Sequence, residues 1–488
     1  MNSGPRLLKR PRGRTVFSGL MTALIVSACS VGPNFERPSV EVPSSFRGSP
    51  PVGSTNSLAE LTWWEIFKDP TLRGLIGTAL TNNYDLRIAV TRVEQAQAVL
   101  AQNRALFLPQ LGYQGSVGRG KNATGGNLFF TGGMAVDTFA VAGNASWEVD
   151  LWGRIRRLNE SARAQFLASH EAQREVAISL ISQVAQAYFR LLALDAQLEI
   201  ARRSTNSFGE SLRIFSQRFE QGVISKLETS AAAAALASAA ATVPEFERQI
   251  FVQENFINVL LGREPGPVAR SATLLQEDLL SSVPAGLPSE LLKRRPDIRE
   301  AEQLLHSATA QIGVAVADFF PRLSLTALFG QVSPELSAFT GGGANAWNAA
   351  ASLAGPLFQG GRLLGQYHQA QAMRAEALLR YQAVVLDAFA EVANDLISVQ
   401  KLSLERVEQA RAVEAYQVAV QVSMERYVAG RASYYEVLQE QQLLFPSENT
   451  LVQVELNQFL SFVQLYQALG GGFPLENGGK AAAPGGSF

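Results

Sequence analysis

Residues 366–429 form a run of 64 residues without glycine or proline, in a chain of 488 residues that carries 40 glycines and 21 prolines. An unbroken helix over this run would be roughly 95 Å long at about 1.5 Å per residue, whereas globular helices average about 11 to 12 residues. Residues 154–208 form a second such run of 55 residues. Two helices of this length predict a protein that spans a distance.

Both runs carry apolar residues at alternating steps of four and three, a pattern typical of helices that pack side by side. In the first half of the chain these residues are Leu180, Val184, Ala187, Leu191, Leu194, Leu198 and Ala201. In the second half they are Val385, Phe389, Val392, Leu396 and Val399. We therefore expect each long helix to pack against other helices along its length.

The N-terminus has the layout of a bacterial lipoprotein signal. Five basic residues precede an apolar stretch, 16–26, that is too short to span a membrane. The stretch ends in Val26-Ser27-Ala28-Cys29, which resembles a lipobox, so residues 1–28 are predicted to be a signal peptide and Cys29 to carry a covalent lipid. The alternative is an ordinary signal cut near Ala28. Cys29 is the only cysteine, which excludes a disulfide within the chain, and Ser30 after it favours sorting to the outer membrane.

Composition and motifs exclude several classes of function. The net charge of −1, without a basic run in the body of the chain, argues against a nucleic-acid partner. His170, His306 and His368 lie far apart and have no metal-site spacing. We find no nucleophile, base and orienting group together, and therefore expect no enzyme, no catalytic residues, no metal and no cofactor other than the lipid on Cys29.

The body of the chain repeats itself. Phe107–Leu111 is similar to Phe319–Leu323 at an offset of 212, and Arg218–Ser225 is similar to Arg426–Ser433 at an offset of 208. We interpret this as a tandem duplication with halves 61–262 and 290–470. A loop segment, 263–289, separates them. Residues 29–60 are predicted to be a linker after the acylated cysteine, and 471–488 a flexible tail.

Each half is predicted to contain a helix, two strands, a long helix, a tight turn and a further helix. In the first half these are a helix within 82–106, strands 109–119 and 139–149, long helix 159–219 and helix 226–261. In the second half they are helix 296–318, strands 321–332 and 346–356, long helix 362–427 and helix 433–469. Strands of this length can cross a bilayer when tilted. No apolar run of about 18 residues is evident, and four strands cannot close a barrel, so crossing a membrane would require an oligomer.

Six motifs stand out along the chain: Cys29 with Val31-Gly32-Pro33, Trp63–Pro70, Ser146–Arg154, Arg295–Arg299 with Glu302, Ala317–Pro321, and Gly355–Arg362. Together they resemble the TolC-type outer membrane efflux proteins, or outer membrane factors, in the acylated NodT-like lipoprotein branch. The resemblance covers residues 63–472. It implies a mainly α protomer with a membrane β-barrel part, in which a homotrimer forms one 12-stranded barrel in the bacterial outer membrane, continued by a periplasmic barrel of helices.

The resemblance also implies a function. The trimer would be the passive exit duct of a tripartite efflux system, fed by an inner-membrane pump through a periplasmic adaptor, with drugs or other small molecules as cargo. The same kind of channel serves metal efflux and type I protein secretion. A different alternative is a periplasmic coiled-coil lipoprotein scaffold that makes no pore, which shares the lipobox and the heptads but does not predict paired strands in both halves.

Residues around two glycines are the candidate site. In the family, the turns at Gly222 and Gly430 would meet the adaptor, together with Arg218 and Arg426 just before them. Glu436 takes the position of an acidic residue that lines the narrowest ring of the closed channel, Gln439 stands where a second acid is often found, and Glu228 is the equivalent of Glu436 in the first half. We expect these three to form the periplasmic gate. The plainer interpretation is that glycine suits a tight turn and that the carboxylates are solvated.

Overall fold

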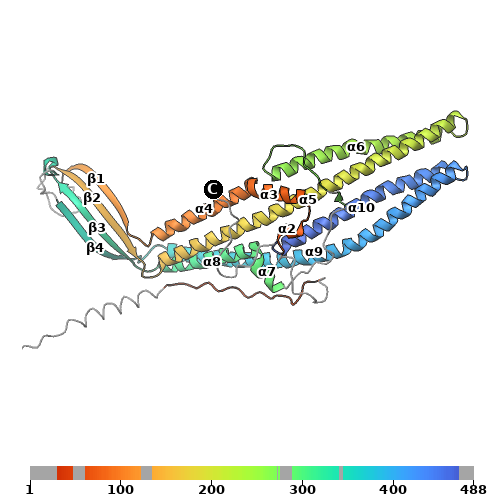
Figure 1. Ribbon diagram of the computed structural model, residues 1–488. Helices are drawn as coiled ribbons and strands as arrows, with labels where there is room; N and C mark the ends of the chain where they lie inside the picture. The colour runs from red at the N-terminus through yellow and green to blue at the C-terminus, as the bar shows by residue number, and fades with distance from the viewer. Residues whose placement is uncertain are drawn as a thin grey trace, which may run out of the picture. The chain divides into compact units, whose positions relative to one another are not determined.

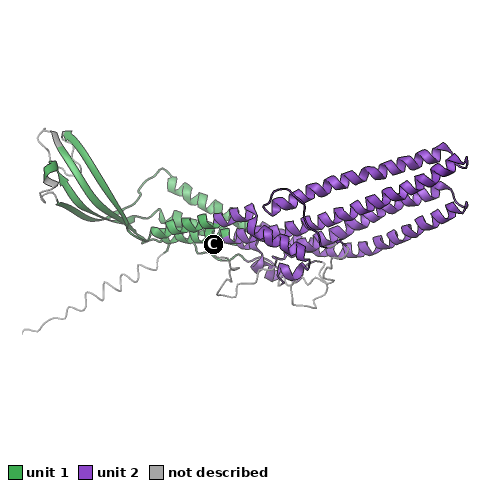
Figure 2. Cartoon of the chain, turned by 45° about the horizontal axis from the view of Figure 1, so that its top comes forward, with its two compact units in different colours: residues 1–38, 93–169, 301–381 green, residues 39–92, 170–300, 382–488 purple. Residues whose placement is uncertain are grey.

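The computed structural model describes residues 30–47, 61–121, 135–271, 273–274, 288–339 and 345–471. The chain divides into two compact units (Figure 2). Unit 1 comprises residues 1–38, 93–169 and 301–381, and unit 2 comprises residues 39–92, 170–300 and 382–488. Neither unit is one of the predicted halves, because each takes segments from both. The predicted signal peptide, Cys29, residues 48–60 of the linker, residues 272 and 275–287 of the loop segment and residues 472–488 lie outside the described residues.

Three pairs of equivalent helices in the two halves have identical lengths (Figure 1). α4 (Tyr84–Ala105) and α8 (Pro296–Ala317) have 22 residues each, α5 (Arg154–Glu220) and α9 (Arg362–Val428) have 67, and α6 (Lys226–Leu260) and α10 (Tyr434–Ala468) have 35. The shorter elements are α2 (Trp63–Ile66), α3 (Pro70–Asn82), α7 (Pro288–Arg294) and the 3₁₀ helix η3 (Leu336–Phe339). The matched lengths and order confirm the tandem duplication.

The first long helix begins at Arg154, five residues before the start predicted for it. Asp150 explains the earlier start, because its carboxylate accepts the backbone N–H groups of Ile155 at 3.1 Å and Arg156 at 3.0 Å. These are among the N–H groups that the first turn of a helix leaves without a partner. Arg154 pairs with Glu148 near the end of the preceding strand, with 2.7 Å between guanidinium nitrogen and carboxylate oxygen. Strand and helix are thus joined with almost no loop.

Four antiparallel strands form one sheet in the order β1-β2-β3-β4. They are β1 (Gln110–Lys121), β2 (Ala135–Val149), β3 (Arg322–Ser333) and β4 (Asn345–Ala354). β2 begins four residues earlier than predicted, because Ala135 pairs with Lys121 and the hairpin continues into the glycine-rich segment. The end of β2 at Val149 is as predicted, and the other strand ends differ from the predicted ones by one or two residues. Alternating side chains show which face a residue occupies, but not where backbone pairing stops.

The strand register places all odd-numbered residues of the sheet on one face, and most large apolar side chains are odd-numbered. They are Leu111, Tyr113, Val117, Val141, Trp147, Leu323, Leu325, Phe329, Trp347 and Leu353. The other face carries Gln114, Ser116, Asn144, Ser146, Ser324, Thr326, Asn348 and Ser352. The apolar face is exposed in this chain: Tyr113 is 93% exposed and Trp347 is 77% exposed. A soluble sheet normally buries such a face.

The helices of unit 2 pack through the predicted apolar seams. Leu180, Val184, Ala187, Leu191 and Ala201 of α5 are buried, as are Val385, Val392 and Leu396 of α9. The remaining seam residues are half-buried. Helices also meet end to end, since the Asn83 amide donates to the carbonyl of Leu260 at 2.9 Å and Arg295 donates to the carbonyl of Ala468 at 3.2 Å. The prediction of long helices packed laterally is confirmed.

α5 contains an 18-residue window with a mean hydropathy of 1.4, which is apolar enough to cross a membrane by length and composition. The expectation that no such run exists was therefore wrong. Two thirds of the window, 67%, is buried inside the protein. That burial is typical of a core helix packed by its neighbours.

A buried carboxylate joins three segments of unit 2. Asp69 caps α3 by accepting the N–H of Thr71 at 2.6 Å, and it also accepts hydrogen bonds from the hydroxyl of Tyr188 in α5 at 2.6 Å and from the hydroxyl of Ser271. Burial disfavours the charge of Asp69, but the hydrogen bonds from Ser271, Tyr188 and the backbone hold its pKa below the ordinary value. The charge is kept in the core by these donors.

Replacing Tyr188 by phenylalanine should destabilise the protein by about 1.5 to 3 kcal/mol, because it removes a hydrogen bond to a buried charge. The pKa of Asp69 is lowered in the folded protein, so its ionised carboxylate contributes to stability at pH values above its ordinary pKa of 3.8. This contribution is lost as the pH falls through the lowered pKa. The loss caused by Tyr188→Phe should therefore shrink in strong acid. Urea unfolding followed by circular dichroism measures both effects.

Tyr435→Phe is the matched control, because Tyr435 is 71% exposed and its hydroxyl can exchange its bonds with water. It should leave stability unchanged. Equal unfolding midpoints for Tyr188→Phe and Tyr435→Phe would show that the Asp69 network does not stabilise unit 2.

Candidate functional site at the α5–α6 and α9–α10 turns

Two helix ends in unit 2 have the same backbone geometry. Gly222 has a φ of +75° and Gly430 a φ of +72°. After α5, the N–H of Val223 bonds to the carbonyl of Arg218 at 2.9 Å, and after α9 the N–H of Arg431 bonds to the carbonyl of Arg426 at 2.8 Å. This is the Schellman arrangement, in which a residue with positive φ lets the chain satisfy the last carbonyls of a helix. The turns therefore require glycine for structural reasons alone.

The arginines before the two glycines make different contacts. The guanidinium of Arg218 lies over the ring of Tyr427, 4.3 Å from its centroid, and reaches the carbonyl of Val428 at 3.5 Å. Arg426 instead pairs with Glu436 of its own hairpin, at 3.3 Å. Arg218 thus links the α5–α6 hairpin to the end of α9, whereas Arg426 stays within the α9–α10 hairpin. A cation near a helix C-terminus also complements the helix dipole.

Glu228 and Glu436 occupy equivalent positions, the third residue of α6 and of α10, but their carboxylates do different things. Glu228 accepts the backbone N–H of Ser225 at 2.7 Å and so caps the start of α6. Glu436 is half-exposed and faces Arg426. Gln439 lies one turn further along α10 and is exposed. The structure thus brings Glu436 to the turn as a charged group and gives Glu228 a local structural role.

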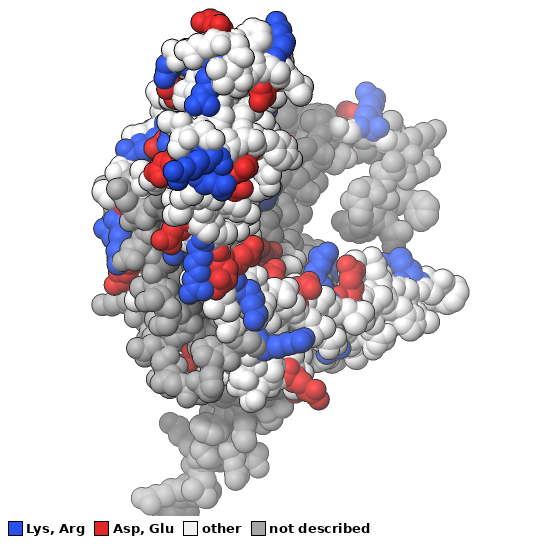
Figure 3. Space-filling view, turned by 90° about the vertical axis from the view of Figure 1, so that its right-hand side faces the viewer, with Lys and Arg blue, Asp and Glu red and all other residues white. Residues whose placement is uncertain are grey.

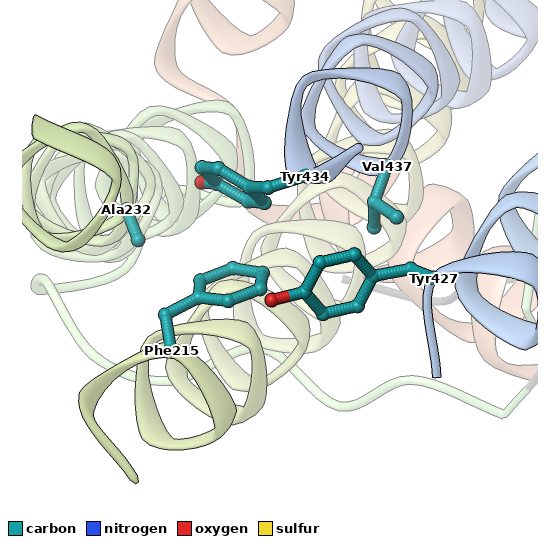
Figure 4. Packing of buried hydrophobic residues seen from close by; sticks show 5 residues of the cluster. All are labelled: Phe215, Ala232, Tyr427, Tyr434 and Val437. Atoms are coloured by element: carbon teal, nitrogen blue, oxygen red, sulfur yellow. The ribbon is translucent and has the colours of Figure 1, made fainter. Parts of the chain in front are cut away.

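Behind the turns lies a small aromatic core to which all four helices contribute (Figure 4). Phe215 of α5 contacts Tyr427 of α9, with ring centroids 5.2 Å apart, and Tyr434 of α10, with centroids 3.9 Å apart. Val437 and Ala232 complete the cluster. Burial, with Tyr427 beside it, raises the pKa of Tyr434 to about 12. The cluster fixes the two hairpins against each other.

Sequence reasoning missed this cluster. Phe219 and Tyr427 stand at equivalent positions of the two halves, yet Phe219 is 41% exposed and Tyr427 is buried. The tyrosines at 427 and 434 flank the second glycine turn, and that spacing was the one available signal. Within the described part of the chain, neither buried hydroxyl has a hydrogen-bond partner. The second hairpin is therefore packed differently from the first despite the shared backbone.

The surface at the turns carries both signs of charge. Figure 3 views the molecule from the side on which the turns lie, and basic and acidic side chains are interspersed there without a large patch of one sign. Val223 and Leu227, next to the first turn, are 64% and 77% exposed. A mixed surface with exposed apolar side chains suits contact with another protein.

The residues that follow Cys29 in the chain are hydrogen-bonded to the start of α5 and the residues before it in unit 1. Cys29 itself lies outside the described residues. The N–H of Val31 bonds to the carbonyl of Trp152 at 3.0 Å. Arg157, which is buried, donates to the carbonyls of Val31 and Gly32, each at 3.2 Å, and to the side chain of Asn34 at 2.8 Å. The chain that follows the predicted lipid is thus fixed beside the junction between β2 and α5.

Comparison with known proteins gives a family match in each half of the chain. A family model described as "Outer membrane efflux protein" matches residues 75–263 and 287–471. The chain is 33% identical over 472 residues to the "Probable efflux pump outer membrane protein TtgC" of Pseudomonas putida, covering 95% of this chain and 97% of that protein. It is also 33% identical over 454 residues to the "Cation efflux system protein CusC" of Escherichia coli K12, covering 92% and 98%.

A solved structure has the same fold. The outer-membrane channel OprN aligns with a TM-score of 0.84 and 30% identity, and the alignment covers 91% of this chain and 99% of that one. The likeness therefore includes both the long helices and the strands.

The geometry of the turns gives a stability test. Gly430→Ala and Gly222→Ala should each destabilise the protein by about 1 kcal/mol, because a Cβ is disfavoured at this positive φ. No heavy atom lies within 4 Å of a Cβ built at either position, so the backbone alone sets the cost. Thermal unfolding of the purified variants measures it.

Gly74→Ala is the matched control. Gly74 lies inside α3, where a Cβ would also meet nothing within 4 Å, and alanine is the better helix former by roughly 0.5 to 1 kcal/mol. This variant should be as stable as the parent or more so. A Gly430→Ala variant that is equally stable would show that the turn does not need glycine for its backbone.

Proposed function

The chain belongs to the outer membrane efflux protein family and is an outer membrane efflux channel, and on this premise we propose that three copies form the passive exit duct of a tripartite efflux system. The observation that carries the proposal is the sheet, which combines an exposed apolar face with two open edges. In the described strands, β1 and β4 each pair with one neighbour only. Lipid offers no hydrogen-bond partner to backbone N–H and C=O groups. A sheet that faces lipid must therefore close into a barrel, so that no strand edge is left unpaired.

Copies of the chain supply that closure. β1 of one copy would pair with β4 of the next, so that three copies give a closed barrel of twelve strands with Tyr113, Phe329 and Trp347 facing lipid. A second surface supports the assembly. Leu386, Ile397, Leu404, Val418 and Val422 are all exposed on α9 and lie along one stripe of that helix. An exposed stripe of this length is typical of a helix that packs against a further chain.

The turns at Gly222 and Gly430 are the proposed contact with a periplasmic adaptor, which in turn joins an inner-membrane pump. The mixed charge of the surface at the turns and the exposed side chains of Val223 and Leu227 support this proposed contact. Arg218 and Arg426 shape these turns through their contacts with Tyr427 and Glu436. The channel has no energy source of its own in this proposal, because the pump drives transport.

Glu436 is the proposed gate residue. Three copies around the channel axis would form an anionic ring with Gln439 one turn away. The pair with Arg426 partly neutralises each carboxylate, and an exposed pair of this kind contributes only about 0 to 1 kcal/mol. Movement of the α9–α10 hairpin could therefore separate the charges at small cost. Glu228 is left out of the ring, since its carboxylate caps α6.

For the cargo we propose small organic molecules. Relatives named for toluene, solvent or antibiotic efflux are 33% to 34% identical to this chain. Cation efflux is the second candidate, favoured by CusC at 33% identity. The duct itself does not select between them in this proposal, because the pump that feeds it decides which molecules enter.

The protein should form channels in planar bilayers, and those channels should prefer cations. Glu436→Gln should reduce the preference for K⁺ over Cl⁻, since three negative charges are lost from the constriction. Reversal potentials in a salt gradient measure the preference, and single-channel recordings measure the conductance.

Glu228→Gln is the matched control, because it changes the equivalent carboxylate of the other repeat and should leave ion preference unchanged. A protein that inserts but never conducts would be the scaffold lipoprotein and not a duct. Conducting channels whose ion preference is the same with glutamate or glutamine at position 436 would remove Glu436 from the gate while leaving the duct intact.

Membrane attachment is tested at the N-terminus. Cys29→Ser should abolish labelling by radioactive palmitate in cells, because the thiol that receives the lipid is absent and the chain has no other cysteine. Ser30→Ala, which keeps the cysteine, should be labelled normally. Normal labelling of Cys29→Ser would show that the lipid is elsewhere or that the signal is of the ordinary kind.

A further inference from the structure

The two β-hairpins of unit 1 repeat each other in register as well as in sequence. In the first hairpin, Gln110 of β1 lies opposite Ser146 of β2. In the second hairpin, Arg322 of β3 lies opposite Ala354 of β4. The offset of 212 relates β1 to β3 and the offset of 208 relates β2 to β4, and together they convert the first of these pairs into the second. The duplication therefore preserved which residue faces which across a hairpin.

The junction between the two hairpins has no counterpart among the described strands of one chain. At this junction β2 pairs with β3, and Asn144 lies opposite Leu328. The repeat relates β2 to β4 and β3 to β1, so the counterpart is a junction between β4 and β1. These two strands are the edges of the sheet, and four strands cannot close a barrel. The counterpart can therefore form only between β4 of one copy and β1 of the next.

We propose that β4 and β1 of adjacent copies pair in the register of the β2–β3 junction, which places Ser352 of one copy directly opposite Ser116 of the next. The two offsets convert Asn144 and Leu328 into these two serines. This inference rests on the ring of three copies proposed above, and it adds the residue pairs at the three junctions of that ring. The neighbouring pairs are Ala351 with Val117, Leu353 with Gly115, Ala354 with Gln114, and Gly355 with Tyr113.

The side chains that this register brings together are complementary in size. The large side chains of the apolar face, those of Tyr113, Val117 and Leu353, are 93%, 78% and 66% exposed in the single chain. Each of them comes to lie opposite a glycine or an alanine, which leaves room for it. An aromatic ring can also cover the backbone of a glycine in the neighbouring strand. On the polar face, the two serine hydroxyls can form a hydrogen bond across the strands.

Other registers lose this complementarity. A shift by one residue would place the apolar face of one copy beside the polar face of the next. A shift by two residues keeps the faces, but in one direction it sets Leu353 opposite Tyr113, two large side chains in one place. In the other direction it sets Gly355 opposite Gly115, and Leu353 opposite Val117. Only the register of the β2–β3 junction pairs large with small throughout.

Disulfide crosslinking of the full-length protein in membranes tests the register. Directly opposite residues have Cβ atoms about 4.5 to 5.5 Å apart, close to the reach of a disulfide, whereas diagonal neighbours at about 7 to 8 Å are too far apart. Ser352→Cys combined with Ser116→Cys should therefore link copies after oxidation by copper phenanthroline, and complete reaction should give covalent trimers on non-reducing gels. Ala351→Cys with Val117→Cys should do the same. Opposite pairs alternate between close and wide spacing, so one of these two pairs is of the close type.

Two double variants that are shifted by two residues are the matched controls. They are Ser352→Cys with Gln114→Cys, and Ala354→Cys with Ser116→Cys, and they should form disulfides about tenfold more slowly, because their cysteines would be diagonal neighbours. Links within one chain are excluded, since β1 and β4 lie three strand spacings of about 4.8 Å apart. The parent, whose one cysteine is Cys29, gives the background.

The register and the duct fail in different ways. A shifted pair that links as fast as the direct pairs, or faster, would overturn the register. Channels that conduct in planar bilayers although neither direct pair links would overturn it as well, and would leave the duct intact. Direct pairs that link in a protein that never conducts would support the register and refute the duct.

Discussion

Lateral packing of helices is the constraint on which the rest of this structure depends. A helix of 67 residues satisfies its own backbone, but it has far too much surface to be covered by a compact core. Its stability must come from neighbours along its whole length, and the buried seam through Val184, Leu191 and Val392 supplies them. Each long helix needs a partner of equal length, and duplication of one unit provides that partner directly.

Duplication fixed the backbone of the two hairpins and left their side chains free to diverge. The turns at Gly222 and Gly430 have the same geometry, so both hairpins end in the same way. Yet Glu228 caps a helix where Glu436 remains a charged surface group, and Phe219 is exposed where Tyr427 is buried. In the α5–α6 hairpin the glutamate after the turn forms a local capping hydrogen bond. In the α9–α10 hairpin the equivalent glutamate forms an exposed ion pair, and the tyrosines beside the turn pack into the aromatic cluster.

Sequence patterns predicted the long helices well, because glycines mark their ends and heptads mark their faces. The helix predicted at 362–427 spans Arg362–Val428. Patterns of this kind carry no information on contacts between distant residues. Asp69, Tyr188 and Ser271 meet across 119 and 202 residues. Burial and the repulsion of Glu391 raise the pKa of Asp395 to about 7, although the sequence shows only a polar helix position. The sequence likewise shows Asn159 and Gln303 only as polar helix positions. In the structure their side-chain oxygens are buried and have no hydrogen-bond partner among the described residues.

The exposed surfaces of the single chain have one consistent explanation. An apolar sheet face such as that of Tyr113 and Trp347 requires lipid, while the open edges of β1 and β4 require a strand beside each of them. A different chain could cover one edge but would leave a new one. Copies of the same chain leave none when they close a ring, because every β1 then finds a β4. A ring of copies can also cover the exposed stripe of Leu386, Leu404 and Val422 on α9, so one symmetric assembly accounts for both the open strand edges and this stripe.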